Sequence, residues 1–134
     1  MPARPRVLIV DDEERFRNTM SKLLSVSGFP NKTTGSGKQA IEELTGNSYD
    51  VAIVDVRMPE MSGVELLSDL KKIDPTIEVI ILTGYASLDT AKAIIKLGAF
   101  DYMLKPYAIE ELTEKIEAAY DRKIARARLT SHLT

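Results

Sequence analysis

The chain has 134 residues, 44% hydrophobic and 28% charged, with 18 basic and 20 acidic residues and a net charge of −2. This length suits one globular domain with a single core, and the balanced charge argues against direct binding of nucleic acid. The absence of cysteine excludes disulfides and thiolate metal sites, and nothing indicates an oxidising compartment, so we expect a cytoplasmic protein.

The start of the chain does not resemble a targeting segment. Residues 1–5 are interpreted as a loose lead-in, and the apolar run that follows, residues 7–10, is too short for a signal-peptide core or a membrane span. We therefore expect no contact with a membrane.

Short apolar runs recur along the chain and predict buried strands. In chain order the predicted strands are residues 7–10, 29–34, 51–54, 79–82 and 100–104. Continuous apolar character is typical of parallel strands that are covered on both faces. Residues 29–34 are the weakest strand, because Pro30 and several polar residues suit an edge position where a missing N–H is tolerated.

Apolar residues at steps of three and four lie after each of these strands and predict helices that bury one face. The stripes are Phe16, Met20, Leu23 and Leu24; Ala40, Ile41 and Leu44; Val64, Leu67 and Leu70; Leu88, Ala91, Ile94 and Ile95; and Ile109, Leu112, Ile116 and Tyr120. Gly28, Gly46 and Gly98 follow three of the stripes, where a left-handed C-cap favours glycine. Five alternations of strand and helix predict an α/β fold with a parallel sheet between helices.

The last helix continues beyond its apolar stripe into residues 121–134. This stretch contains strong helix formers and several basic residues but has little to bury. Two interpretations stay open: a fraying, solvated terminus, or the beginning of a linker helix to an output domain.

Polar residues follow the predicted strands at the edge where open parallel sheets bind ligands. They are Asp11 and Asp12 after the first strand, Asp55 after the third, Thr83 after the fourth and Lys105 after the fifth. Each alone has an ordinary explanation; Asp11 or Asp12, for example, could cap the first helix. Independent strand ends would rarely supply the whole set, so together they indicate a functional site.

The chemistry of these residue types explains why they would act together. Mg²⁺ prefers oxygen ligands, which Asp11, Asp12 and Asp55 provide, and the cation would relieve the repulsion among three carboxylates. An aspartate that attacks phosphorus forms an aspartyl phosphate, whose oxygens then need positive charge and hydrogen-bond donors. Lys105 and Thr83 are suited to that role.

Five ordered motifs resemble the receiver domains of bacterial two-component response regulators. They are Asp11-Asp12, residues 54–63 (VDVRMPEMSG), Thr83-Gly84, residues 98–104 (GAFDYML) and Lys105-Pro106. The resemblance covers about residues 4–120 and places the receiver domain at residues 6–120. It implies a flavodoxin-like (βα)5 three-layer sandwich whose five-stranded parallel sheet has the order 2-1-3-4-5.

The resemblance implies a role for individual residues of the site. Asp55 would accept a phosphoryl group from a sensor histidine kinase, and Thr83 and Lys105 would contact that group. Asp11 and Asp12 would hold Mg²⁺, for which Mn²⁺ could substitute, together with the Asp55 carboxylate and the backbone carbonyl of Arg57.

The resemblance also implies a switch. Thr83 would move toward the phosphoryl group while Tyr102 turns inward, which alters the face formed by the fourth helix, the fifth strand and the fifth helix. Two copies are expected to pair through this face on phosphorylation and to control an output domain or partner. Lys105-Pro106 is expected to be a cis peptide, which proline permits.

Two positions tune the loss of the phosphoryl group in this family, and here they are Arg57 and Tyr85. A cation and a phenol there would shield the acyl phosphate from water, so we expect slow dephosphorylation. Residues 58–67 and 83–85 resemble receivers of the NtrC type, which are often joined to ATPase and DNA-binding domains.

Three other functions share parts of this pattern. A haloacid-dehalogenase phosphatase needs a second acid two residues after its nucleophile, where Arg57 stands. A P-loop enzyme is suggested by residues 35–38 (GSGK), but Lys32 and Gln39 occupy the first glycine and the Ser/Thr positions. A degenerate receiver that only binds partners stays open as an alternative, although the complete set of acids, threonine and lysine argues against it.

Overall fold

The structure is a computed structural model that describes residues 4–55, 63–84 and 88–133. Strands and helices alternate through these residues. The elements are β1 (Val7–Val10), α1 (Glu14–Val26), β2 (Asn31–Thr34), α2 (Gly37–Gly46), β3 (Val51–Asp55), α3 (Gly63–Ile73), β4 (Glu78–Thr83), α4 (Leu88–Lys96), β5 (Asp101–Leu104) and α5 (Ile109–Leu133).

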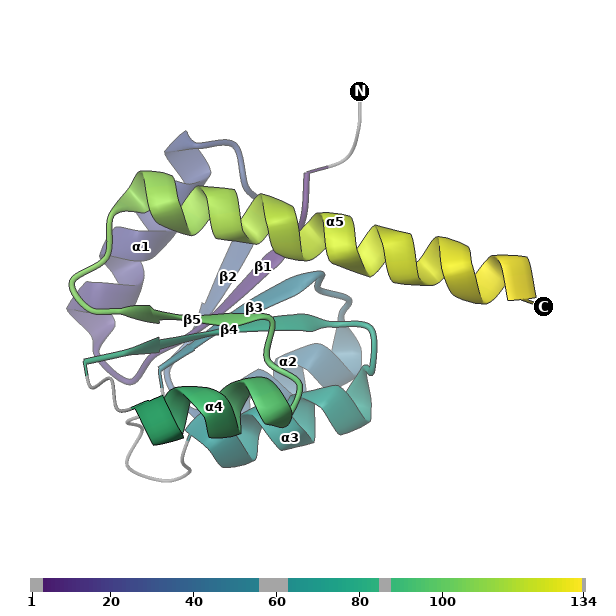
Figure 1. Cartoon of the computed structure of the whole chain (residues 1–134). Coiled ribbons are helices and arrows are strands. Elements are labelled where there is room, and N and C mark those ends of the chain that lie inside the picture. Colours follow the sequence, from purple (N-terminus) through teal and green to yellow (C-terminus); the bar gives the residue numbers. More distant parts are fainter. Residues whose placement is uncertain (1–3, 56–62, 85–87, 134) are drawn as a thin grey trace.

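The strands form one parallel sheet of order β2-β1-β3-β4-β5. Helices α1 and α5 cover one face of the sheet, and α2, α3 and α4 cover the other (Figure 1). This is the flavodoxin-like three-layer sandwich that the sequence predicted. In the parts of the chain that the structure describes, no helix combines the length and the apolar character needed to cross a membrane.

The continuous apolar strands supply a core on each side of the sheet. In β1, for example, Leu8 and Val10 pack toward α2 and α3, whereas Val7 and Ile9 pack toward α1 and α5. All four side chains are at most 1% exposed. Because successive residues of a strand point to opposite faces, the apolar runs reflect a sheet with no face in water.

Strands β3 and β4 are longer at their ends than the apolar runs predicted, whereas β2 and β5 begin two residues and one residue later than predicted. Strand β3 includes Asp55, and β4 includes Glu78 at its start and Thr83 at its end. These polar residues join the ladder, where Asp55 pairs with Leu82 and Val51 pairs with Glu78. Two of the candidate site residues are therefore fixed by the sheet itself and do not belong to loops.

The expectation of left-handed glycines is right at two positions and wrong at a third. Gly28 and Gly98 have φ angles of 90° and 106°, where only glycine is comfortable. Gly46 is the last residue of α2 and has no positive φ. The helix ends instead at Asn47, whose backbone is extended and whose N–H donates to the Glu43 carbonyl at 2.9 Å.

The C-terminal part of α5 is held to the domain by charge. Glu78, at the start of β4, is 0% exposed. Its carboxylate accepts hydrogen bonds from Arg122 and, at 3.2 Å, from Arg126, while the Lys71 ammonium lies 3.7 Å away. A buried carboxylate needs such partners to remain in the interior.

A second ion pair strengthens this attachment. The Lys123 ammonium donates to Asp50 at 2.6 Å, and the same carboxylate accepts the backbone N–H of Arg6 at 2.8 Å. Residues 122–126 thus have more contact with the body than their composition predicted. Helix α5 continues as one helix to Leu133, and its end extends past the body (Figure 1).

We predict that Arg122→Met together with Arg126→Met lowers the free energy of unfolding by about 2 kcal/mol, because among the described residues the buried Glu78 carboxylate then keeps only Lys71 as a cationic partner. The partial exposure of both arginines places the effect below that of a fully buried pair. Urea unfolding measures the change, with Arg128→Met on the exposed part of the same helix as the control. Equal losses in the double variant and the control would show that the ion pairs with Glu78 do not hold α5 to the domain.

Candidate phosphorylation site

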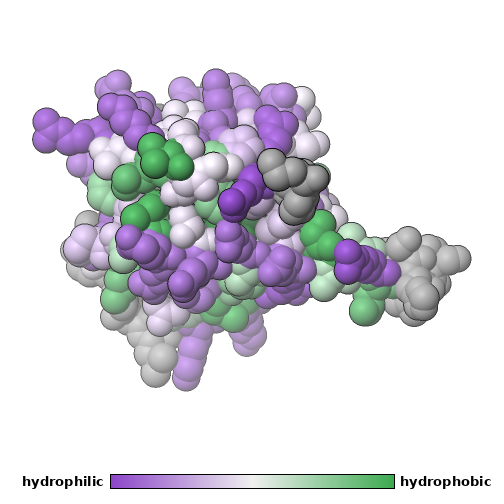
Figure 2. Space-filling model, turned by 90° about the horizontal axis from the view of Figure 1, so that it is seen from above, coloured by the Kyte–Doolittle hydropathy of each residue, from purple (hydrophilic) through white to green (hydrophobic). Residues whose placement is uncertain are grey.

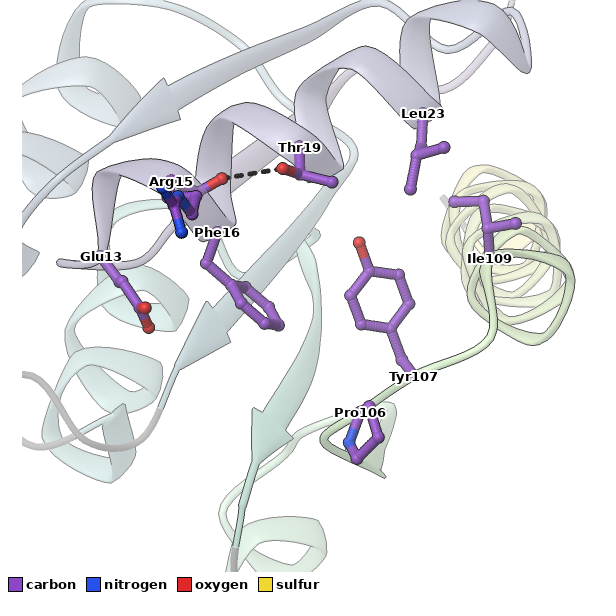
Figure 3. A pocket seen from close by; sticks show the side chains of 8 residues that line it. All are labelled: Glu13, Arg15, Phe16, Thr19, Leu23, Pro106, Tyr107 and Ile109. Atoms are coloured by element: carbon purple, nitrogen blue, oxygen red, sulfur yellow. Dashed lines mark hydrogen bonds between the residues drawn. The ribbon is translucent and has the colours of Figure 1, made fainter.

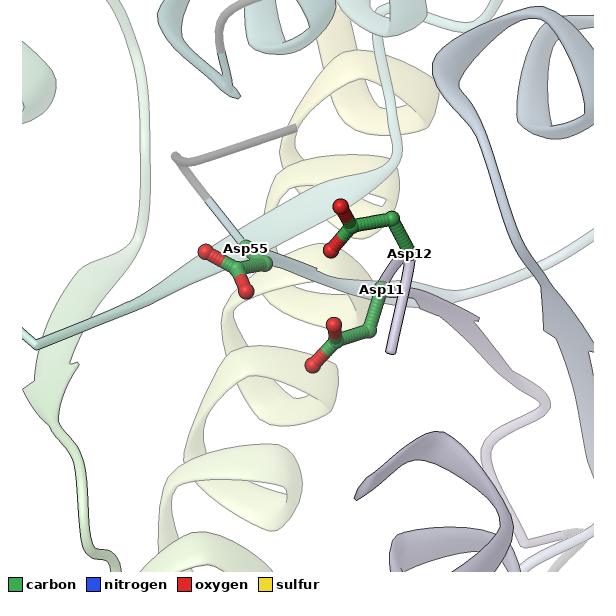
Figure 4. Close-up of side chains that lie close together, drawn as sticks. All are labelled: Asp11, Asp12 and Asp55. Carbon is green, nitrogen blue, oxygen red and sulfur yellow. The ribbon is translucent and has the colours of Figure 1, made fainter. Parts of the chain in front are cut away.

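Three carboxylates meet where β1 and β3 end. Asp11 and Asp12 follow β1 directly and Asp55 is the last residue of β3, and Figure 4 shows their side chains close together. One carboxylate oxygen from each lies within 4.8 Å of the others. Asp11 and Asp55 are only 3% and 6% exposed, whereas Asp12 is exposed. This arrangement of hard oxygen donors could hold a divalent cation.

The backbone around the acids fixes their direction. The N-cap of α1 is Glu13, whose side chain makes no capping hydrogen bond, so neither aspartate is the cap residue of the helix. Asp11 instead accepts the N–H of Glu13 at 3.0 Å through its side chain. The Arg17 guanidinium donates to the backbone carbonyls of Asp11 and Asp12 at 3.2 and 3.4 Å and so braces the loop.

Lys105, which directly follows β5, brings a positive charge to the acids from a strand two places away from β3 in the sheet. Its ammonium lies 2.7 Å from Asp55 and 3.4 Å from Asp11, and the side chain is 19% exposed. The backbone N–H of Lys105 donates to the Thr83 carbonyl at 2.8 Å, which continues the pairing of β4 with β5. The Lys105-Pro106 peptide is cis.

The charges of the site compete with one another. Burial raises the pKa of Asp11, and the charge of Asp55 adds to this, although the Glu13 N–H and Lys105 oppose it. For Lys105 burial lowers the pKa, but the hydrogen bond to Asp55 and the charges of Asp11 and Asp55 outweigh that effect and raise it. Ionised Asp11 is therefore incompletely compensated, and a cation would relieve the excess negative charge.

Thr83 and Tyr102 lie on the neighbouring strands. Thr83 ends β4 and is 2% exposed, one residue beyond Leu82, the partner of Asp55 in the sheet. Tyr102 is half-buried on β5 and packs against the core on the α4 side. It lines a shallow pocket with four residues of α4: Ala91, Lys92, Ile95 and Lys96.

Two predicted site residues, Arg57 and Tyr85, lie outside the described residues. The carbonyl ligand assigned to Arg57 and the slow dephosphorylation assigned to both residues stay predictions.

An apolar groove borders the site between α1 and the segment that leads into α5. Phe16, Thr19 and Leu23 line one side and Pro106, Tyr107 and Ile109 the other, with Glu13 and Arg15 at its end (Figure 3). Its volume is about 440 Å³. Figure 2 shows that the surface above α1 and α5 is otherwise mainly hydrophilic.

Sequence patterns missed two residues near the site. Phe16 was assigned to the core by its helical spacing, yet its ring lies 4.2 Å from the Lys105 ammonium. Arg17 belongs to no motif, and a single arginine on a helix is usually a surface residue. Its spacing from Asp11 and Asp12, on the first turns of the following helix, is the signal that could have been used.

Comparison with known proteins decides the family. Residues 7–117 match the sequence model of the response regulator receiver domain. The chain belongs to this family. All described site residues lie within the range that matches the family. The interpretations as a haloacid-dehalogenase phosphatase or a P-loop enzyme are therefore set aside. In agreement, Ser36 of the glycine-containing loop accepts the Gln39 N–H at 3.1 Å and caps α2.

The receiver is similar to the regulatory protein AtoC of Escherichia coli, with 35% identity over 89% of this chain and 26% of that protein. It is 37% identical to the DNA-binding transcriptional regulator NtrC of Klebsiella pneumoniae, over 83% of this chain and 24% of NtrC. The chain thus spans about a quarter of the length of these curated relatives. It also resembles the beryllofluoride-activated NtrC4 receiver domain dimer, with a TM-score of 0.83 and 33% identity over 88% of this chain and 98% of that one.

We predict that Asp11→Asn stabilises the metal-free domain at neutral pH. Asparagine keeps an oxygen that accepts the Glu13 N–H. It removes a buried carboxyl group whose pKa is raised above its ordinary value of 3.8. Protonation of Asp11 favours the folded state, so the wild type becomes more stable as the pH falls through this raised pKa. The difference in free energy of unfolding between the variant and the wild type therefore shrinks and disappears below the ordinary pKa.

Thermal unfolding without metal at several pH values measures this difference. Mg²⁺ at ten times its dissociation constant should then stabilise the wild type by about 1.4 kcal/mol and the variant by less. A variant that is less stable than wild type at pH 7 without metal would show that Asp11 is fully compensated by Lys105.

Proposed function

We propose that Asp55 is the phosphoacceptor of this receiver and that a sensor histidine kinase supplies the phosphoryl group. The observation that carries the proposal is the convergence at Asp55, whose carboxylate lies beside Asp11 and Asp12 and 2.7 Å from the Lys105 ammonium. These residues come from three different strands of the sheet, and a structural role for each would not require them to meet.

The reaction would transfer one phosphoryl group between two proteins. An Asp55 oxygen forms a bond to phosphorus while the bond from phosphorus to the donor histidine nitrogen breaks, and that nitrogen keeps the electron pair. Lys105 needs to move only a short distance from the carboxylate to reach a phosphoryl oxygen. Thr83 would contribute its hydroxyl from the neighbouring strand. The domain would thereby promote its own phosphorylation and dephosphorylation, without turning over a separate substrate.

Mg²⁺ fits the acids of the site, with Mn²⁺ as a substitute. Asp11, Asp12 and Asp55 offer the hard oxygen ligands that this ion prefers, and the raised pKa of Asp11 reflects negative charge that burial leaves uncompensated. The backbone carbonyl of Arg57 would complete the protein ligands. The ion would supply positive charge to the transferred phosphoryl group.

The response would pass to the face formed by α4, β5 and α5. Tyr102 lies on β5, which belongs to this face, and Thr83 lies on the neighbouring strand β4. Tyr102 also packs beside α4. We infer that their movement on phosphorylation alters the face, favours pairing of two copies and controls an output domain. Residues 121–134 would begin the linker to that domain, as the continuous helix α5 supports. We place the protein in the cytoplasm on the basis of its family.

We predict that acetyl phosphate with Mg²⁺ adds one phosphoryl group to a peptide that contains Asp55. Mass spectrometry of the digested domain detects the addition. Asp55→Asn should abolish it, and Asp11→Asn should reduce it because a metal ligand is lost. Lys105→Met should still accept the group but respond weakly in the dimerisation measurement below. A phosphoryl group on another residue, or equal labelling of Asp55→Asn, would refute the assignment.

We predict that beryllofluoride with Mg²⁺ shifts the domain from monomer toward dimer. The NtrC4 receiver, to which this chain is similar, forms a dimer in its beryllofluoride-activated state. Sedimentation velocity measures the shift. Ile95→Asp, which puts a charge at a 44% exposed position on α4, should stay monomeric, while Val26→Asp at an exposed position on α1 should behave as wild type. Dimerisation of the Ile95 variant would place the interface elsewhere.

A further inference from the structure

We propose that Phe16 is a positioning residue for Lys105: its aromatic face holds the ammonium while Lys105 exchanges the Asp55 carboxylate for a phosphoryl oxygen. This inference rests on the proposed function of Asp55, which it deepens.

The Lys105 ammonium lies between two kinds of partner. On one side are the carboxylates of Asp55 and Asp11, at 2.7 and 3.4 Å. On the other is the ring of Phe16, whose centroid is 4.2 Å from the nitrogen. A cation at this distance is attracted by the negative face of the ring. The ring thus replaces part of the water that would otherwise surround a lysine of 19% exposure.

The position of the ring is itself fixed. Phe16 lies near the start of α1, a few residues after Asp11 and Asp12, and is half-buried against the core on the α1 and α5 side. Tyr107 meets its ring edge to face, with centroids 5.9 Å apart and an interplanar angle of 66°. Figure 3 shows both rings in the groove. Because Tyr107 follows Lys105 by two residues, the segment that carries the lysine also steadies the ring.

Hydrogen bonds and ring contacts respond differently to movement. A hydrogen bond weakens steeply when its angle or distance changes, so Lys105 must break its bond to Asp55 as it bonds to a phosphoryl oxygen. Attraction to a ring face extends over a broad area within about 6 Å of the centroid. The relative contribution of Phe16 is therefore largest midway through the exchange, when neither oxygen bonds the ammonium fully, and an aliphatic side chain cannot supply it.

The alternative is that Phe16 only fills space beneath α1. Phe16→Leu removes the aromatic face but retains apolar bulk, and Phe16→Tyr restores the face. Replacing Phe16 by fluorinated phenylalanines with one, two and three fluorine atoms weakens the negative face in steps with little change of shape. Leu23→Ala lies in the same groove and does not contact Lys105 within the described interactions, so it serves as a control for groove packing.

The first measurement uses the unphosphorylated domain. The side-chain methylene protons next to the Lys105 nitrogen should resonate upfield in NMR spectra, because the nitrogen to which this methylene is attached lies over the ring. Phe16→Leu should abolish the upfield shift, while Phe16→Tyr and Leu23→Ala should retain it. A normal shift in the wild type would refute the contact, and this result does not depend on whether Asp55 is phosphorylated.

The second measurement is the rate of phosphorylation as a function of acetyl phosphate concentration with Mg²⁺. We expect Phe16→Leu to lower the limiting rate roughly fivefold with little change in the concentration for half-maximal rate, and the fluorinated series to decline in steps. Phe16→Tyr and Leu23→Ala should stay near the wild type. A flat fluorinated series, or an equal loss in Leu23→Ala, would overturn the inference and assign Phe16 to packing. No phosphorylation of the wild type would instead refute the proposed function.

Discussion

Three negative charges are brought to one edge of the sheet, and two of them, on Asp11 and Asp55, are almost completely buried. Water cannot screen such charges, so they must be balanced by groups that the protein provides or binds. Lys105 provides part of this balance through contacts of 2.7 and 3.4 Å. Burial nevertheless raises the pKa of Asp11, so the charged form of this group remains costly. The site would thus gain stability from additional positive charge, which the proposed metal ion would supply.

At the opposite edge of the sheet, where the strands begin, a buried negative charge is balanced in a different way. Glu78 is as deeply buried as any core residue, but its carboxylate meets cations from α3 and from α5. There the charge is satisfied within the chain, and no ligand is required. Strand β4 joins the two edges, with Glu78 at its start and Thr83 at its end. One edge is therefore electrostatically complete and structural, whereas the other is incomplete and suited to chemistry.

Whether a feature of the fold or the site could be predicted from the sequence depended on how far apart along the chain the interacting residues lie. Local patterns were sufficient for β1 and for the alternation of elements, because continuous apolar runs leave few other arrangements for a chain of this size. The strand order came from the family resemblance, and the structure confirms it. The set at residues 11, 12, 55 and 105 could be predicted because parallel strands all end at one edge. The predicted left-handed glycine cap of α2 was wrong, because Asn47 in an extended conformation caps the helix.

Contacts between distant segments could not be predicted from composition. The basic stretch after residue 120 has little to bury by its own composition, and the sequence does not reveal that Glu78 lies beneath it, 44 residues away from Arg122. Phe16 fitted a core stripe, and periodicity cannot distinguish a residue that faces the core from one at the border of a site. Both contacts escape the sequence for one reason: a helical pattern gives the face of a residue but not its neighbour on another element.

The attachments of α5 suggest how the two edges communicate. The helix begins shortly after Lys105 and Tyr107, beside the site, and is bound to Glu78 and Asp50 through Arg122, Arg126 and Lys123. If the proposed function moves the segment at Lys105, the displacement would act on a helix that is restrained near the amino ends of the strands. Bending would break backbone hydrogen bonds inside the helix, whereas a small rotation about the ion pairs only changes the geometry of long side chains. Rotation is the less costly response, and the continuation of α5 to Leu133 would carry it beyond the body of the domain.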